Sequence, residues 1–296
     1  MADYTKGAAY IDGQLVPIAE AKISLLDWGF LHSDATYDVV HVWDGKFFRL
    51  NDHLQRFYSG MDKLRMSIPY SPEQVQEIIS DCVKATGLRE SYVEIITTRG
   101  TPQPGSRDPR LCTNKFFAFA IPFVWITQPD QGLHLVISET QRIPAASVDP
   151  VVKNYHWLDL VKGQFEAYDK GGETAALVDA EGNIMEGPGF NIFAIKDGVI
   201  TTPASGVLQG VTRKTSMQLA PECGYKMVEG TLTADLLRNA DEAFATSTAG
   251  GIMPISKIDG KDVGNGSIGA MTKTLQDAYW ALHKHPDYAI DIDYSS

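Results

Sequence analysis

The alternation of hydrophobic and polar residues along the chain predicts short strands that are joined by tight turns. Apolar runs flank the dipeptides Asp12-Gly13 and Asp44-Gly45, which supply the positive φ angles of a two-residue hairpin turn. The same alternation around glycine-containing turns recurs in the second half of the chain. On this pattern, hairpins are expected at 8–18, 36–50, 175–187 and 190–203.

Apolar residues spaced three and four positions apart predict helices with one buried face. Asn51 is expected to cap a helix over 52–66, which carries Arg56 near its first turn. The capping-box sequence that begins at Ser71 places proline in the first helical position, and Gly87 is a suitable C-terminal stop. Further helices are expected at 158–172, from Val211 to about Gly224, in a short turn after Thr233, and from Ile268 to about His283.

Segments rich in β-branched and aromatic residues predict the remaining strands, at 92–100, 115–126, 133–139, 226–229 and 242–247. A loop rich in Pro, Gly and Arg, at 101–110, is long enough to be a binding element. Polar, turn-forming residues over 127–132 mark an expected linker between a smaller N-terminal domain, 1–126, and a larger C-terminal domain, 133–296. The expected fold class is α+β, with antiparallel hairpins dominating.

Composition narrows the class of function. A formal net charge of −11, without a run of Lys and Arg, argues against nucleic-acid and membrane-surface binding. The start of the chain lacks a signal pattern, and the longest apolar stretch is broken by Pro122, so a soluble cytoplasmic protein with small-molecule substrates is expected. Cys82, Cys112 and Cys223 are scattered without metal-ligand spacing, and we expect neither a disulfide framework nor a metal site.

Lys153 is a candidate for covalent chemistry because valines precede it and the aromatic run from Tyr155 to Trp157 follows it. Such surroundings desolvate an ammonium group and lower its pKa, and a lysine with a lowered pKa forms Schiff bases. For a lone lysine the better alternative is an aliphatic stem that packs while its head reaches water.

Three later positions are candidates for holding an aldehyde cofactor that carries a phosphate. Glu186 lies among glycines, where a planar ring can approach the backbone; the alternative is a solvated acid at a hairpin end. Gly210 precedes a helix start, so the amides of Val211 and Thr212 are expected to point at an anion. Thr248, on a tight glycine loop, offers a hydroxyl donor. Each signal alone is weak.

The order of these segments resembles the fold-type IV pyridoxal-phosphate enzymes over nearly the whole chain. The motifs that carry the resemblance are HLQRF, VVKNYHW, EGPGFNIF, GVLQGVTR and TSTAGGIMP. The resemblance implies a two-domain α+β fold like that of D-amino acid aminotransferase, with a smaller N-terminal α/β sandwich and a larger C-terminal pseudo-barrel of mostly antiparallel strands. It makes Lys153 the Schiff-base lysine and Glu186 the partner of the pyridine nitrogen. The phosphate contacts that it implies are Arg56, Val211, Thr212 and Thr248.

Within this family, the run LHSDATYDVVHVW at 31–43 is closest to the His-Ser-Asp-x-Thr-Tyr-Asp-Val pattern of (R)-selective amine transaminases. The substrate-binding residues that this resemblance implies are His32, Tyr37, Val39, Tyr92, Glu94, Trp157 and Ala249. Those enzymes usually place an arginine in the loop after the TRG strand. Here Gln103 and Pro104 stand about there, and Arg107 is the candidate substitute for binding the keto acid carboxylate. The Arg-x-His pair of D-amino acid aminotransferases is not present in this loop.

The resemblance therefore predicts a homodimeric transaminase that moves the amino group of a primary (R)-amine to a keto acid such as pyruvate by a ping-pong mechanism. Lys153 is expected to act as the general base. The alternatives are a branched-chain or D-amino acid aminotransferase, a lyase that acts on a chorismate-derived amine, and a non-catalytic small-molecule binding protein on the same scaffold.

Overall fold

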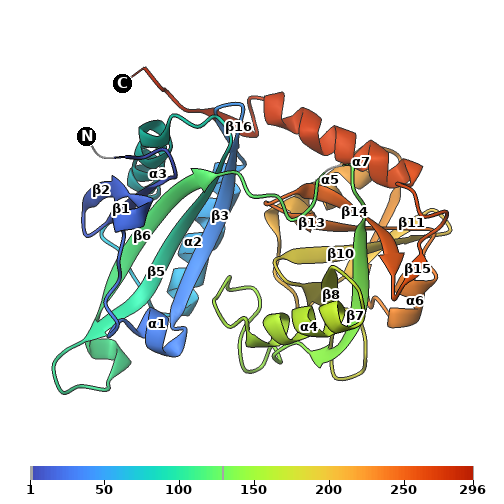
Figure 1. Cartoon of the computed structure of the whole chain (residues 1–296), viewed down its shortest axis with the longest axis horizontal. Coiled ribbons are helices and arrows are strands. Elements are labelled where there is room, and N and C mark those ends of the chain that lie inside the picture. The colour runs from blue at the N-terminus through green and yellow to red at the C-terminus, as the bar shows by residue number, and fades with distance from the viewer. Residues whose placement is uncertain (1–2, 129, 296) are drawn as a thin grey trace. The chain divides into compact units, whose positions relative to one another are not determined.

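The computed structural model describes residues 3–128 and 130–295, which form two compact units. Unit 1 comprises Met1–Val124, Val152–Tyr155 and His283–Ser296, and unit 2 comprises Trp125–Val151 and His156–Leu282. The fold class is α+β, as expected from the sequence (Figure 1). The domain ranges 1–126 and 133–296 stay a prediction, and the expected linker includes Pro129, which lies outside the described residues.

Unit 1 is built on a seven-stranded sheet in the order β16-β4-β3-β5-β6-β1-β2. Each pair of neighbouring strands in it is antiparallel. Its strands are β1 Ala8–Ile11, β2 Gln14–Pro17, β3 Ala35–Trp43, β4 Lys46–Phe48, β5 Ser91–Pro102, β6 Cys112–Pro122 and β16 Ala289–Asp291. Its helices are η1 Ile18–Glu20, α1 Trp28–His32, α2 Leu50–Lys63, α3 Pro72–Thr86, η2 Pro109–Leu111 and η3, which is assigned Leu282–Lys284 and begins at the end of unit 2.

The two expected N-terminal hairpins are present because their turns are Asp-Gly pairs in the left-handed region. Asp44 has φ 51° and Gly45 has φ 74°, and the turn at residues 12–13 has the same conformation. Ser71 forms the expected capping box, and Gly87 ends α3 in a left-handed conformation. The expectation for Asn51 is wrong: α2 begins at Leu50 after Arg49, so Asn51 lies inside the helix.

Helices α2 and α3 cover the same face of the unit 1 sheet (Figure 1). Side chains alternate across a strand, so every second residue of β3 and β5 faces these helices and the others face away. The buried cluster on the helix side includes Val40, Val42, Val93, Ile95, Leu54, Phe57 and Ile79. The residues of β3 and β5 that face away from the helices, beginning with Tyr37 and Tyr92, can form a binding wall.

Unit 2 contains a nine-stranded mixed sheet with the path β12-β11-β10-β13-β14-β7-β8; β9 pairs with β10 and β15 with β14. Its strands are β7 Leu133–Gln141, β8 Thr174–Val178, β9 Glu186–Gly187, β10 Phe190–Lys196, β11 Val199–Pro203, β12 Lys226–Gly230, β13 Glu242–Ser247, β14 Gly251–Ile258 and β15 Lys261–Asp262. Its helices are α4 Leu158–Asp169, α5 Val211–Glu222, α6 Ala234–Arg238 and α7 Ala270–Ala281.

The pairs β7–β8, β7–β14 and β11–β12 are parallel, which the hairpin pattern did not predict. Helix α4 packs on β7 and β8, whereas α5 and α7 pack on β13 and β14. These packings hold the start of α5 and the turn after β13 on a rigid sheet. None of the helices in the described part of the chain combines the length and the apolar run that a membrane crossing needs.

Candidate active site

A wall of four expected substrate residues lies on the outer face of β3 and β5. Val39 pairs directly with Glu94, and Tyr37 and Tyr92 are two residues away on their own strands. Because side chains alternate across a strand, all four project from the same face. The structure therefore brings together Tyr37, Val39, Tyr92 and Glu94, which the sequence alone placed on two separate segments.

The segment that contains Lys153 adds to the edge of β3 beyond the short strand β4. The carbonyl of Lys153 accepts hydrogen bonds from the Tyr37 amide, at 3.1 Å, and from Thr36 Oγ1, at 2.8 Å. Asn154 forms a bridge with Thr36. These contacts explain why 152–155 belongs to unit 1 although the sequence around it belongs to unit 2. They also place the half-buried Lys153 amino group 4.5 Å from the centroid of the Tyr37 ring, where a cation interacts favourably with the ring.

Glu94 is buried beside this lysine and binds two phenols. Tyr155 Oη donates to its Oε1 at 2.5 Å, and Tyr92 Oη donates to its Oε2 at 3.1 Å. The ring of Tyr155 is stacked on that of Tyr37, with centroids 4.3 Å apart and an interplanar angle of 11°. Burial raises the pKa of the Glu94 carboxyl, against the opposing effects of the two tyrosines and of Lys153.

Arg56, the expected phosphate ligand on α2, is held by Asp38 on the helix-facing side of β3. Its Nε donates to Oδ2 at 2.7 Å and its Nη2 to Oδ1 at 2.8 Å. His53 Nδ1 lies 2.7 Å from the same Oδ1. Burial opposes ionisation of Asp38, but the Arg56 charge and the His53 contact together lower the pKa of this carboxyl below its usual range. The network fixes the guanidinium, and the phosphate role of Arg56 stays a prediction.

Two other expected substrate residues of unit 1 lie outside this wall. His32 is exposed at the end of α1, with its ring 4.6 Å from that of Trp28. Arg107 is exposed in the loop after β5. Within the described part of the chain, Arg107 has no hydrogen bond or ion pair, so its side chain is available to an anion. Its role for the keto acid stays a prediction.

In unit 2, Glu186 lies on the short strand β9 and is buried. Arg142 donates to its Oε1 from Nη2, at 3.0 Å, and from Nε, at 3.2 Å. The amide of Leu208 donates to its Oε2 at 3.0 Å. Arg142 also binds Asp159 of α4 through Nη1. A buried guanidinium between two carboxylates thus fixes the orientation of Glu186.

Helix α5 begins at Val211 after Gly210, and no side chain caps its first turn. A Cβ atom built on Gly210 would lie 2.3 Å from Asn191 Oδ1, so only glycine fits against this asparagine, whose Nδ2 donates to the Leu208 carbonyl at 2.9 Å. Thr246 is the direct partner of Asn191 in the β10–β13 ladder, and its side chain lies on the same face. Its buried Oγ1 has no hydrogen-bond partner among the described residues. The donors at this place suit an anion.

The turn between β13 and β14 contains Thr248 and Ala249. Its backbone is fixed by two hydrogen bonds, from the Ala249 amide to Ser247 Oγ at 3.2 Å and from the Ile126 amide to the Ala249 carbonyl at 2.9 Å. The remaining expected substrate residue, Trp157, precedes α4; its ring edge lies 3.6 Å from the position of a Cβ built on Gly189, so the indole borders the turn that follows Glu186.

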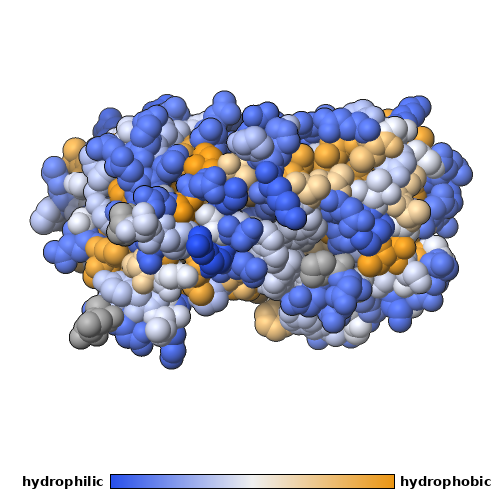
Figure 2. Space-filling view, turned by 90° about the horizontal axis from the view of Figure 1, so that it is seen from above, coloured by the Kyte–Doolittle hydropathy of each residue, from blue (hydrophilic) through white to orange (hydrophobic). Residues whose placement is uncertain are grey.

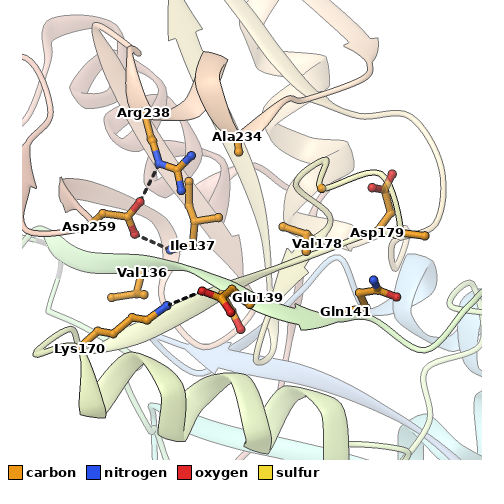
Figure 3. Close-up of a pocket in the computed structure, with 13 residues that line it drawn as sticks. Val136, Ile137, Glu139, Gln141, Lys170, Val178, Asp179, Ala234, Arg238 and Asp259 are labelled. Carbon is orange, nitrogen blue, oxygen red and sulfur yellow. Dashed lines mark hydrogen bonds and ion pairs between the residues drawn. The ribbon is translucent and has the colours of Figure 1, made fainter.

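A separate pocket of about 600 Å³ in unit 2 is lined by residues of β7, β8 and α6 (Figure 3). Arg238 Nε pairs with Asp259 Oδ2 at 2.8 Å, and Lys170 lies 3.7 Å from Glu139. None of the expected site residues lines this pocket. Across the described ranges, moreover, no three His, Cys, Asp or Glu side chains gather in a way that would hold a metal ion.

Sequence reasoning missed the residues that orient the expected ones. Asp38 orients Arg56, Arg142 orients Glu186, and Tyr155 connects Glu94 to Tyr37. Asp38 and Tyr155 stand inside the motifs that carry the resemblance, so an acid or phenol within a motif was an available signal. Arg142 follows a strand without a motif, and only the fold brings it to Glu186.

Comparison with known proteins assigns a family to this arrangement. The family model described as Amino-transferase class IV matches residues 35–258. A putative branched-chain-amino-acid aminotransferase of Methanocaldococcus jannaschii is 34% identical over 273 residues, which cover 91% of this chain and 94% of that protein. D-alanine aminotransferase of Staphylococcus haemolyticus is 28% identical over 91% of this chain and 95% of its own length.

Among solved structures, a branched-chain amino acid aminotransferase of T.th. with pyridoxamine 5'-phosphate superimposes with a TM-score of 0.90. The two sequences are 28% identical, and the match covers 98% of this chain and 100% of the other. The similarity thus extends over both units and over every segment that carries an expected site residue.

Proposed function

The chain belongs to the class IV aminotransferase family, and from this we propose that it is a pyridoxal-phosphate-dependent aminotransferase with Lys153 as its reactive amine. The observation that carries the assignment of the lysine is its placement: the Lys153 amino group is half-buried and lies over the Tyr37 ring, beside Glu94. An amine held among rings on a strand edge has a defined position, unlike the flexible head of a surface lysine.

The residues present fit the cofactor. The uncapped start of α5 and the unpartnered hydroxyl of Thr246 are donors suited to the phosphate, and a side chain larger than hydrogen at Gly210 would displace Asn191. Glu186, oriented by Arg142, would face the ring nitrogen. When bound, pyridoxal phosphate supplies a carbonyl group that joins to amines and a ring that withdraws electrons from the donor carbon.

Four actions fall to the chain itself. Lys153 Nζ holds the cofactor, and once displaced by the donor it takes and returns the proton at the donor carbon. Glu186 keeps the ring nitrogen protonated. The Tyr37 and Tyr92 rings form an aromatic wall for the substrate. Arg56, positioned by Asp38, binds the phosphate.

We place amino acids first as donors, of the branched-chain or D-alanine type, with a keto acid as acceptor. The related proteins are called branched-chain-amino-acid and D-alanine aminotransferases, and the Methanocaldococcus jannaschii protein is 34% identical to this chain. Arg107, exposed and without a polar partner in the described ranges, is the candidate for the substrate carboxylate.

A second candidate donor is a primary (R)-amine, with pyruvate as acceptor. The run HSDATYDV at 32–39 and the chemistry beside Lys153 favour it. Glu94 is an acid within the wall, and an acid repels a donor that carries its own carboxylate. A donor without a carboxylate avoids that repulsion.

A panel of donors separates these proposals. The purified chain, loaded with pyridoxal phosphate, is assayed with L-leucine, D-alanine, and (R)- and (S)-1-phenylethylamine, each with pyruvate and with 2-oxoglutarate. Turnover of either amino acid, but of neither amine, supports the first donor class. Consumption of the (R)-amine alone supports the second. If no donor is consumed, or if Lys153→Ala turns over as fast as the parent, the proposed function is wrong. Glu186→Gln is expected to retain cofactor but to slow proton transfer strongly.

We also propose a homodimer. Large apolar side chains are exposed on both units, which is costly in water unless they are covered. On α4 they follow one helix face, at Leu158, Val161, Phe165 and Tyr168, and before and on α1 they include Leu25, Leu26 and Phe30. Hydrophobic side chains also form separate patches on the face drawn in Figure 2. Light scattering that reports only a fully active monomer would contradict the dimer. The expected cytoplasmic location stays a prediction.

A further inference from the structure

The amino group of Lys153 lies at one end of a row of aromatic rings whose other end is fixed by Glu94. Tyr37 lies under the amine, at 4.5 Å from its ring centroid, and Tyr155 is stacked on Tyr37 at 4.3 Å. The hydroxyl of Tyr155 donates to Glu94 Oε1 at 2.5 Å. Any rotation of the Tyr155 ring therefore strains this hydrogen bond and disturbs the ring beneath the amine.

The groups around Glu94 favour a negative charge at this position. Each carboxyl oxygen accepts a phenolic O–H, from Tyr155 and from Tyr92, and the Lys153 charge acts on the same group. Burial raises the pKa of both tyrosines, so they remain hydrogen-bond donors. Burial of Glu94 and the charge of Asp38 act in the opposite direction and raise the pKa of Glu94.

Two further titratable groups on β3 lie near this cluster. Asp38, on the opposite face of β3, is neutralised by Arg56 and bonded by His53. His41 pairs with Tyr92 in the β3–β5 ladder, and its Nε2 lies 2.7 Å from His283 Nε2. Lys153 is thus the cation that acts directly on Glu94, and Glu94 is the acid that acts directly on Lys153.

We propose that Glu94 is a positioning residue for Lys153: its carboxylate fixes the Tyr155–Tyr37 stack under the amine, and its charge favours the ammonium form of that amine. The inference deepens the proposed function, because the protonation of Lys153 matters to the reaction only if Lys153 is the reactive amine. A lysine attacks a carbonyl only after it loses its proton. Glu94 thereby sets the pH above which the chain captures its cofactor.

Two substitutions separate the charge of Glu94 from its hydrogen bond. Glu94→Gln removes the charge but keeps an oxygen that accepts from one phenol, whereas Tyr155→Phe keeps the charge and the ring stack but removes the bond to Glu94. Tyr58→Phe is the matched control, because it removes a phenol elsewhere in unit 1 whose hydroxyl donates to the Tyr70 carbonyl at 2.8 Å. The readout is the rate at which Lys153 is acetylated in the cofactor-free full-length chain over a series of pH values, followed by mass spectrometry of its peptide.

In Glu94→Gln, the midpoint of the pH profile should fall by about one pH unit, the size expected when one nearby charge is removed at an effective dielectric constant of about 20. In Tyr155→Phe, the midpoint should stay near that of the parent while the plateau rate at high pH changes, because the amine loses its fixed support. Tyr58→Phe should match the parent in both quantities.

An unchanged midpoint in Glu94→Gln would overturn the proposal, as would equal shifts in Glu94→Gln and Tyr58→Phe, which would indicate a loss of structure. If Glu94→Gln does not fold, Tyr155→Phe carries the test, and a plateau rate equal to that of the parent would be contrary evidence. No turnover enters the measurement. A chain that proved inactive as an aminotransferase would leave this outcome intact, so the two failures are distinguishable.

Discussion

Asp38 holds the guanidinium of Arg56 through two hydrogen bonds, of 2.7 Å from Nε to Oδ2 and 2.8 Å from Nη2 to Oδ1. The paired geometry fixes the plane of the guanidinium, which a single point contact would not do. Asp38 lies on the helix-facing side of β3, next to Tyr37 on the other side. One strand therefore carries both the wall near Lys153 and the anchor of the expected phosphate ligand.

Asp38→Asn should destabilise the fold by about 3 kcal/mol, because it leaves a largely buried guanidinium without its counter-charge. Urea unfolding measures the loss, and spectroscopic titration with pyridoxal phosphate should show weaker binding. Asp108→Asn is the control: it breaks the exposed pair with Arg110 and should leave both quantities unchanged. Equal effects of the two substitutions would contradict the anchoring role of Asp38.

His53 should make stability depend on pH. Burial lowers the pKa of its imidazole, against the favourable charge of Asp38. The unfolded chain therefore binds this proton at higher pH than the folded chain does, with a pKa of about 6.5. The contribution of His53 to the free energy of unfolding is complete above that pH and is lost as pH falls through the lowered pKa, by at most about 1.4 kcal/mol per pH unit.

Urea unfolding between about pH 5 and pH 8 tests this dependence. His53→Asn, whose amide replaces Nδ1, should reduce the slope of the free energy of unfolding against pH. His285→Asn, at a half-exposed position on the C-terminal segment, should leave the slope unchanged. If His53→Asn keeps the slope of the parent, the lowered pKa of His53 is not the source of the pH dependence.

Arg142→Met should lower stability by about 3 kcal/mol, because it leaves Glu186 and Asp159 buried together without a cation. The difference from the parent should be larger at pH 7.5 than at pH 5, since protonation removes the charge of the unpaired carboxyls. Adding Asp159→Asn should restore part of the loss. Thermal melts at the two pH values measure these effects, and a loss that does not depend on pH would exclude uncompensated charge as its cause.

Local patterns predicted local structure well. The Asp12-Gly13 and Asp44-Gly45 turns and the Ser71 capping box were confirmed because each depends only on residues a few positions apart. The α+β class, the aminotransferase family and its pyridoxal-phosphate cofactor were also predicted; the (R)-selective branch and the role of each site residue stay predictions.

What the pattern missed depends on contacts distant in sequence. Strand β16 returns from the C-terminal segment to pair with β4, and Lys153 joins the edge of β3 although 152–155 interrupts unit 2. No periodicity encodes such a return. The start of α2 was displaced from Asn51 because Arg49 adopts a left-handed conformation and the helix begins directly after it.

Gly210→Ala should weaken cofactor binding by about tenfold, the effect of losing roughly one hydrogen bond to a charged group. Gly210 has φ −61°, which alanine adopts without strain, so the effect is steric: the new Cβ would lie 2.3 Å from Asn191 Oδ1. Asn191 must move, and its hydrogen bond to the Leu208 carbonyl breaks beside the start of α5.

Spectroscopic titration with pyridoxal phosphate and thermal melts measure the binding and the stability of the Gly210→Ala variant. Gly230→Ala is the matched control, since its Cβ would meet only Val228 Cγ1, at an ordinary 3.7 Å. Adding Asn191→Ala to Gly210→Ala relieves the clash and should restore stability more than affinity, because the lost asparagine also supported the backbone before α5. Parent-like affinity in Gly210→Ala would show that the turn at 210–212 does not hold the phosphate.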